Sequence, residues 1–182
     1  MVGRRSDTKK RIQEVALELF SERGYDKTTL KEVADRLNIT RPALYYHFKT
    51  KEDILNGVVG DLLASVEELT EWARAQPRTK AARREILDRL AELFTDRWVP
   101  LMRFAQVNQG SMHDLQAGEQ MQQQIFSLLS VLDDPEADPR RRFEARIAVI
   151  TVMIANVPQL FDDIPEDERG AIAMRVATDL AG

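Results

Sequence analysis

Apolar residues recur at helical spacing along almost the whole chain, and no stretch alternates between apolar and polar residues as a β-strand would. Leu30, Val33, Ala34 and Leu37, for example, follow the spacing i, i+3, i+4, i+7. This period gathers apolar side chains on one face of a helix. The sequence therefore predicts an all-α protein.

Capping residues and helix breakers divide this pattern into separate helices. The predicted helices run from Ser6 or Asp7 to Gly24, from Leu30 to Leu37, from Thr40 to His47, from Thr50 to near Pro77, through Ile86 and Trp98 to a stop near Pro100, over 117–132, over 139–157, and over 165–181, with a short helix and a turn within 101–116. Thr29 with Glu32, and Thr50 with Asp53, have the spacing of capping boxes.

The charge of the chain is distributed unevenly. Residues 1–51 contain 12 Lys/Arg and 7 Asp/Glu, for a net charge of +5, whereas the remainder contains 14 and 23, for a net charge of −9. A basic head on an acidic body suits a protein whose head alone meets phosphate groups. Chance variation of surface charge is the alternative explanation.

Composition excludes several other classes of protein. The chain has no cysteine, so it has neither disulfides nor a thiolate metal site, and we expect no metal and no cofactor. No apolar run approaches about 18 residues, and the basic N-terminus is not followed by an apolar stretch. We therefore expect a cytoplasmic protein that does not enter a membrane.

The helices at 30–37 and 40–47 are joined by a short connection, Leu37 to Thr40, as in helix-turn-helix units. Asn38 lies where the chain reverses and tolerates a positive φ better than most residues. Leu44 and Phe48 are expected to face inward, so the opposite face of the second helix is free to enter a major groove. Arg41 on that face can donate two hydrogen bonds to a guanine edge.

Further polar residues surround this face. Tyr45 and His47 can donate hydrogen bonds to phosphates, and Thr29, Lys31 and Lys51 lie at helix N-termini or in loops nearby. The alternative is that Tyr45, Tyr46 and His47 only pack a small three-helix domain.

The stretch from Thr28 to Lys51 resembles the DNA-binding signature of the TetR family of bacterial transcriptional regulators, and Phe20, Gly24 and Tyr25 add to the resemblance. One departure is Asn38, where the family usually has glycine. The resemblance covers about residues 8–60 and implies an all-α homodimer whose two heads meet adjacent major grooves. The candidate DNA-binding residues are Thr29, Lys31, Thr40, Arg41, Pro42, Ala43, Tyr45, Tyr46, His47 and Lys51.

Behind the predicted DNA-binding domain (1–51), residues 52–182 are expected to form a larger antiparallel helical domain for regulation and dimerisation. The helix at 139–157 is apolar on more than one face, and the last helix is rich in alanine. Two such helices from each subunit would make a four-helix interface. The alternative is burial within one monomer. The candidate interface residues are Ile150, Ile154, Val157, Ile172 and Val176.

A pocket for a small, largely apolar effector is a second expectation for this domain. Its candidate residues are Trp72, Phe94, Trp98, Met102, Phe104, Met121 and Phe126, although aromatic and methionine side chains at helical spacing more often fill a core. The predicted function is a sequence-specific regulator, most simply a repressor, that binds a palindromic duplex as a homodimer and is released by the effector. A DNA-binding or protein-recruiting module without an effector is the alternative. The chain has no recognisable catalytic motif, so we do not expect an enzyme.

Overall fold

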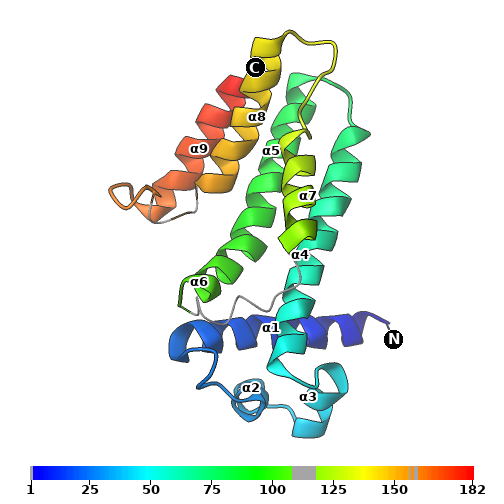
Figure 1. The fold of residues 1–182 in the computed structure, drawn as a ribbon, viewed down its shortest axis with the longest axis vertical. Coiled ribbons are helices and arrows are strands. Elements are labelled where there is room, and N and C mark those ends of the chain that lie inside the picture. Colours follow the sequence, from blue (N-terminus) through cyan, green and yellow to red (C-terminus); the bar gives the residue numbers. More distant parts are fainter. Residues whose placement is uncertain (1, 108–117, 156, 158–159) are drawn as a thin grey trace. The chain divides into compact units, whose positions relative to one another are not determined.

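The computed structural model describes residues 2–107, 118–155, 157 and 160–182, and every regular element in these ranges is helical (Figure 1). In chain order the elements are α1 (Val2–Arg23), α2 (Leu30–Arg36), α3 (Arg41–His47), α4 (Lys51–Arg74), α5 (Lys80–Leu93), the π-helical turn η1 (Phe94–Trp98), α6 (Val99–Val107), α7 (Gly118–Leu129), α8 (Pro139–Ile154) and α9 (Glu166–Ala181). The predicted all-α class is confirmed. No helix of the described ranges is long and apolar enough to cross a bilayer.

The described residues divide into two units by their contacts. The first unit contains residues 2–62 and 100–107, and the second contains 63–99 together with the described part of 118–182. The division therefore falls inside α4, after Leu62, and again at the start of α6. The candidate DNA-binding residues all lie in the first unit.

The first unit is built around the apolar face of α1. Ile12, Ala16, Leu19 and Phe20 on this face are almost completely buried. The Phe20 ring lies 5.1 Å from the Tyr25 ring and 5.9 Å from the ring of Phe104 in α6, centroid to centroid. These three rings form one aromatic cluster, because Tyr25 and Phe104 are also only 6.0 Å apart.

Short-range hydrogen bonds cap several helix starts. The Thr40 hydroxyl accepts a hydrogen bond from the Ala43 N–H at the start of α3, and Asp138 accepts two backbone hydrogen bonds at the start of α8. At the start of α4, Thr50 accepts from the Asp53 N–H, while the Asp53 carboxylate accepts from the Thr50 N–H, each at 3.0 Å. The predicted caps at Thr40 and at Thr50 with Asp53 are thus confirmed.

Two predicted helix limits are wrong by more than three residues. The helix α1 begins at Val2 instead of Ser6 or Asp7. Arginine at positions 4 and 5 favours helix, so the helix continues past the local capping signal. Pro100 does not stop the helix that contains Trp98. Here the chain widens into η1, in which the Val99 N–H bonds to the Phe94 carbonyl five residues earlier, and α6 follows directly.

The widened turn explains how the helix passes Pro100. Proline has no N–H to donate, and its ring clashes with the carbonyl four residues before it in a regular α-helix. A π-turn relieves this clash, and Pro100 then becomes the second residue of α6, where an N–H is not required.

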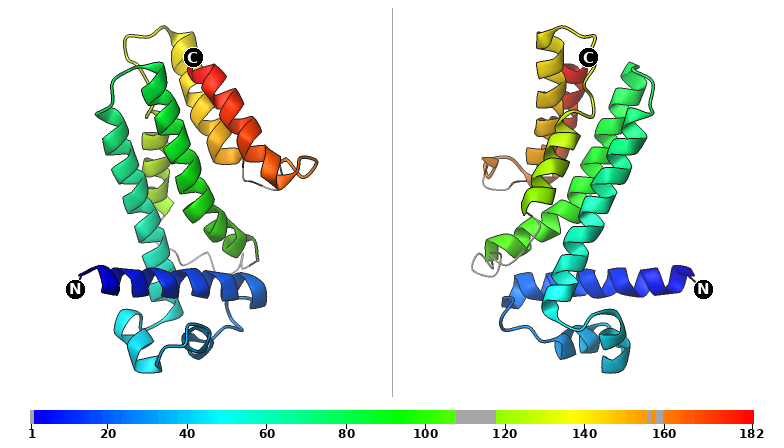
Figure 2. Two further views of the ribbon diagram at one scale, coloured as in Figure 1. Left: turned by 180° about the vertical axis from the view of Figure 1, so that it is seen from behind. Right: turned by 45° about the vertical axis from the view of Figure 1, so that its right-hand side comes forward.

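In the second unit, α8 packs along α9, and α5 packs against both (Figure 2). Ile86, Leu87 and Leu90 of α5 are buried. Ala173 and Ala177 of α9 are buried as well, and their small side chains permit close approach of the neighbouring helices. Thr79 caps α5 through the Ala82 N–H.

Candidate nucleic-acid interface

The turn between α2 and α3 is shaped by its backbone hydrogen bonds. The Ile39 N–H bonds to the Ala34 carbonyl at 3.0 Å, and the Asn38 N–H bonds to the Asp35 carbonyl at 3.1 Å. This pair of bonds is the Schellman motif, which places one residue in the left-handed region. That residue is Asn38, with φ of 53°, so the predicted positive φ is confirmed.

The two sides of α3 differ sharply in exposure. Leu44 is completely buried and Phe48, which caps the helix, is almost so. Arg41, Pro42, Ala43, Tyr45 and Tyr46 are all exposed, with Tyr46 at 61% the most exposed of the two tyrosines. His47 is half-buried, and its ring lies 5.3 Å from that of Tyr46. The face predicted to meet DNA is therefore open to solvent.

Two cations on this surface have their donors available. Within the ranges that the structure describes, neither Arg41 nor Lys31 makes an ion pair or a side-chain hydrogen bond, and both are exposed. An arginine fork of this kind can bind a guanine edge, whereas a lysine acts as a point charge for phosphate. Thr40 uses its hydroxyl oxygen as a cap acceptor, which leaves its hydrogen for a phosphate oxygen.

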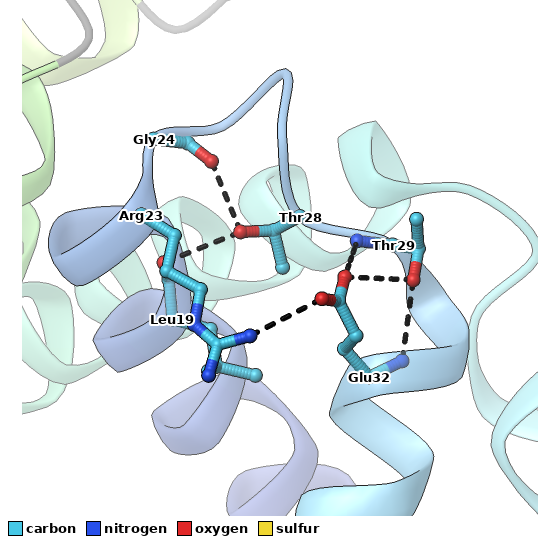
Figure 3. A network of polar contacts seen from close by, with 6 residues as sticks. All are labelled: Leu19, Arg23, Gly24, Thr28, Thr29 and Glu32. Carbon is cyan, nitrogen blue, oxygen red and sulfur yellow. Dashed lines mark hydrogen bonds and ion pairs between the residues drawn. The ribbon is translucent and has the colours of Figure 1, made fainter.

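Thr29, in contrast, is held by the network in Figure 3. Its backbone N–H and its hydroxyl both donate to the same oxygen of Glu32, each at 2.8 Å, and the Glu32 N–H donates back to the hydroxyl at 3.3 Å. The predicted capping box is confirmed. Arg23 of α1 adds an ion pair to Glu32 at 3.2 Å. A phosphate contact from Thr29 would compete with Glu32 for the hydroxyl hydrogen.

The backbone hydrogen bond from Thr29, followed by its hydroxyl bond and the charge of Arg23, lowers the pKa of Glu32. A carboxylate whose pKa is lower in the folded state stabilises the fold above its unfolded pKa, which is about 4.5 for Glu32, and this contribution disappears as the pH falls through the folded pKa. We therefore expect that, as the pH is lowered below 5, the melting temperature of Glu32→Gln falls less than the melting temperature of the parent protein. Thermal unfolding monitored by circular dichroism at pH 3–7 measures this.

Glu18→Gln is the matched control for this prediction, because Glu18 is an exposed carboxylate of α1 without a hydrogen bond or ion pair among the described residues. Its acid profile should follow that of the parent protein. Identical profiles for Glu32→Gln and the parent would show that the capping carboxylate does not contribute to acid sensitivity.

Lys51 is engaged within the first unit. Its ammonium group donates to the Tyr25 carbonyl at 2.5 Å and lies 4.2 Å from the centre of the Tyr25 ring. Burial, followed by the charges of Glu52 and Asp26, raises the pKa of Tyr25, so the ring stays neutral. Lys51 thus ties the loop after α1 to the start of α4. Any phosphate contact from Lys51 uses the donors that remain on its ammonium group.

The candidate pocket residues are divided between the two units. Phe104 belongs to the aromatic core of the first unit, where Met102 is half-buried. In the second unit Phe94 and Trp98 lie 5.5 Å apart across the π-turn, and Trp72 is stacked under the Arg89 guanidinium at 3.7 Å. Phe126 is exposed. The side chain of Met121 lies outside the described residues.

The candidate interface residues are apolar side chains that the second unit leaves only partly buried or exposed. Ile150, Ile154 and Val157 are half-buried, and Ile172 and Val176 of α9 are exposed. The candidate interface residues did not include Phe143, which is 65% exposed and begins a stripe on α8 that continues through Ile147, Ile150 and Ile154. The spacing of this stripe, four, three and four residues, is the signal that could have identified it.

A four-residue turn joins α2 and α3, and α3 has a buried inner face and an open outer face of polar and aromatic side chains. This arrangement defines the helix-turn-helix class of DNA-binding domain. The comparison with known proteins agrees. Residues 12–58 match the family described as "Bacterial regulatory proteins, tetR family". The chain is 42% identical over 52 residues to the HTH-type transcriptional regulator AcrR of Shigella flexneri, a match that covers 29% of this chain and 24% of AcrR.

The chain is also 50% identical over 46 residues to IcaR of Staphylococcus aureus, the HTH-type negative transcriptional regulator of the biofilm operon icaADBC, with 25% of each protein covered. The matched segment thus spans about a quarter of the length of these curated relatives. Solved structures match over almost the whole chain. A transcriptional regulator (TerR/AcrR family) from Aquifex aeolicus VF5 has a TM-score of 0.61 at 20% identity, with 95% of this chain and 97% of that chain covered.

A complex of SmeT with triclosan gives a TM-score of 0.60 at 22% identity, with 95% of this chain and 90% of SmeT covered. The N-terminal domain therefore belongs to the TetR family of bacterial regulatory proteins, and the chain as a whole has the fold of that family's solved members.

Proposed function

We propose that this chain is a cytoplasmic transcriptional regulator, with no catalytic activity, that binds a palindromic DNA duplex as a homodimer through α3. The observation that carries the proposal is the open face of α3, on which Arg41 and Tyr45 are exposed while Leu44 and Phe48 anchor the helix in the core. The net charge of +5 in residues 1–51 supports it, because the contacts with phosphates fall in that segment. Repression is favoured by the similarity to IcaR, whose name describes a negative regulator.

The homodimer is supported by the two-helix apolar face of α8 and α9. Besides the residues that pack within the unit, this face exposes Phe143, Ile172 and Val176. A two-fold axis through such a face pairs it with its own copy and forms a four-helix interface. The dimer would present two copies of α3, and half-sites about one helical turn apart match this arrangement. In this proposal, residues 1–51 contact DNA and residues 52–182 regulate and dimerise.

Selection of duplexes from a genomic or random-sequence library by the purified protein tests the DNA-binding function. Recovery of a common palindromic sequence is the expected result. A protein that recovers every sequence equally at physiological salt would not be a sequence-specific regulator.

We further propose that a small, largely apolar molecule binds within residues 52–182 and releases the DNA. The similarity in fold to SmeT, whose solved structure contains triclosan, supports this proposal. The aromatic pair Phe94 and Trp98, the first and last residues of the π-turn, supports it too, because π-turns are common at functional sites. The alternative is a regulator of the same fold without an effector. Two placements support this alternative: Phe104 lies in the aromatic core, and Trp72 lies under Arg89.

The two alternatives make opposite predictions about binding. A molecule that releases DNA about tenfold must prefer the free protein over the DNA-bound protein by about 1.4 kcal/mol, because coupling between two sites is reciprocal. Calorimetric titration of such a molecule, found by its release of the selected duplex, should therefore give a tenfold weaker affinity when the duplex is present. Equal affinities in the two titrations would contradict the effector mechanism.

A further inference from the structure

A polar cluster of Lys9, Gln13 and Asp61 joins α1 to α4 inside the first unit. The Gln13 amide donates to one oxygen of Asp61 at 2.8 Å, and the Lys9 ammonium lies 3.1 and 3.3 Å from the two oxygens. Gln13 is only 5% exposed, whereas Lys9 and Asp61 are partly open to solvent. The buried amide is therefore held in place by a carboxylate 48 residues away.

Gly57 lies one helical turn before Asp61, on the same face of α4. A Cβ atom at this position would lie 3.0 Å from the Gln13 amide nitrogen and 3.1 Å from Cε1 of the Phe48 ring. Both distances are shorter than ordinary van der Waals contact, so the absent side chain lets the α4 backbone approach both groups. Gly60 on the same helix has nothing within 4 Å of its corresponding position.

Phe48 connects this contact to the recognition helix. It is the C-cap residue of α3, its N–H bonds to the Leu44 carbonyl at 3.0 Å, and its side chain is 4% exposed. A displacement of the Phe48 ring therefore moves the end of α3. On the other side of Gly57, the Gln13 amide cannot withdraw without losing its hydrogen bond to Asp61.

We propose that Gln13, Gly57 and Asp61 are positioning residues that set the placement of α3 on DNA without touching the DNA themselves. This inference rests on the proposed DNA-binding function. Hydrogen bonds to base edges require each donor to lie within about 0.5 Å of its ideal position. A shift of a few tenths of an ångström at Phe48 therefore weakens base contacts, while contacts with phosphates through long flexible side chains tolerate it.

The first test compares Gly57→Ala with its matched control Gly60→Ala. Both changes make the same substitution in α4, but only the first meets Gln13 and Phe48. Binding is measured to the duplex that the parent protein selects and to a scrambled duplex of the same length. Gly57→Ala should bind the selected duplex about tenfold more weakly, with unchanged affinity and salt dependence on the scrambled duplex. Gly60→Ala should bind both duplexes as the parent protein does.

The second test changes the other end of the cluster. Asp61→Ala leaves the buried Gln13 amide without its acceptor, whereas Asp61→Asn keeps an oxygen that can accept from it. The selected duplex should be bound more weakly by Asp61→Ala, and Asp61→Asn should recover most of the affinity. A purely electrostatic effect of losing the negative charge would alter the two variants equally.

Hydrogen exchange of residues 41–48 in the DNA-free protein gives a readout that does not depend on the operator. Exchange in this segment should be faster in Gly57→Ala than in Gly60→Ala or the parent protein. Unchanged exchange, or equal affinity of the two glycine variants for the selected duplex, overturns the inference. A parent protein that selects no sequence refutes the proposed function, and the exchange comparison then still decides whether the cluster positions α3.

Discussion

Replacing Arg41 with alanine is expected to weaken binding to the preferred duplex by roughly 5- to 150-fold, which corresponds to about 1–3 kcal/mol for a lost bidentate contact to guanine. Preference at one base pair in each half-site should relax at the same time. The stability of the fold should change little, since the Arg41 side chain is exposed and makes no hydrogen bond or ion pair in the described part of the chain. Affinity measured over all single-base variants of the selected duplex tests this.

Lys31→Ala is the comparison variant for Arg41→Ala. Lys31 is also exposed and unpaired among the residues that the structure describes, but an ammonium group near a helix start is suited to phosphate. Its loss should weaken all duplexes by a similar factor and reduce the slope of log affinity against log salt by about one. Lys51 is a poorer choice, because its ammonium also holds the Tyr25 carbonyl. If Lys31→Ala changes base preference while Arg41→Ala does not, the two roles are reversed.

The second large effect is expected for Val176→Glu, which should convert the dimer to a monomer. Val176 is 44% exposed on α9 and lies one turn after Ile172 on the same face. In the proposed interface, a two-fold axis would bury a carboxylate from each subunit against apolar side chains. Burial of an unpaired charge costs several kcal/mol, so the dissociation constant of the dimer should rise by about 100-fold or more. Sedimentation or light scattering over a range of protein concentrations measures this change.

Arg175→Glu is the control for this prediction, because it introduces the same side chain at the neighbouring, exposed and already polar position. It should remain dimeric. Val176→Glu should also lose most of its affinity for a duplex with two half-sites. A monomer has only one DNA-binding domain and lacks the added affinity that a second, linked domain provides. A dimeric Val176→Glu protein would show that this face of α9 lies outside the interface.

The features that the sequence alone determined depend on residues close together in the chain. The capping box of Thr29 and Glu32 and the left-handed turn at Asn38 each involve atoms within five residues. Side-chain type and spacing decide such geometry, since the hydrogen bonds form within the same turn of chain. Helical periodicity likewise predicted the buried Leu44 and the open face of α3.

Tertiary structure decided the features that depend on distant residues. The pattern of α6 could not show that Phe104 packs with Phe20 and Tyr25 in the first unit. Gln13 is a single polar residue within an apolar face of α1, and only its distance of 2.8 Å from Asp61 explains its burial. Pro100 predicted a helix end, but in the structure the helix continues past it, because a π-turn directly before Pro100 accommodates the proline. A residue's local preference against helix, about 1–3 kcal/mol, is outweighed when the helical conformation buries a larger apolar surface.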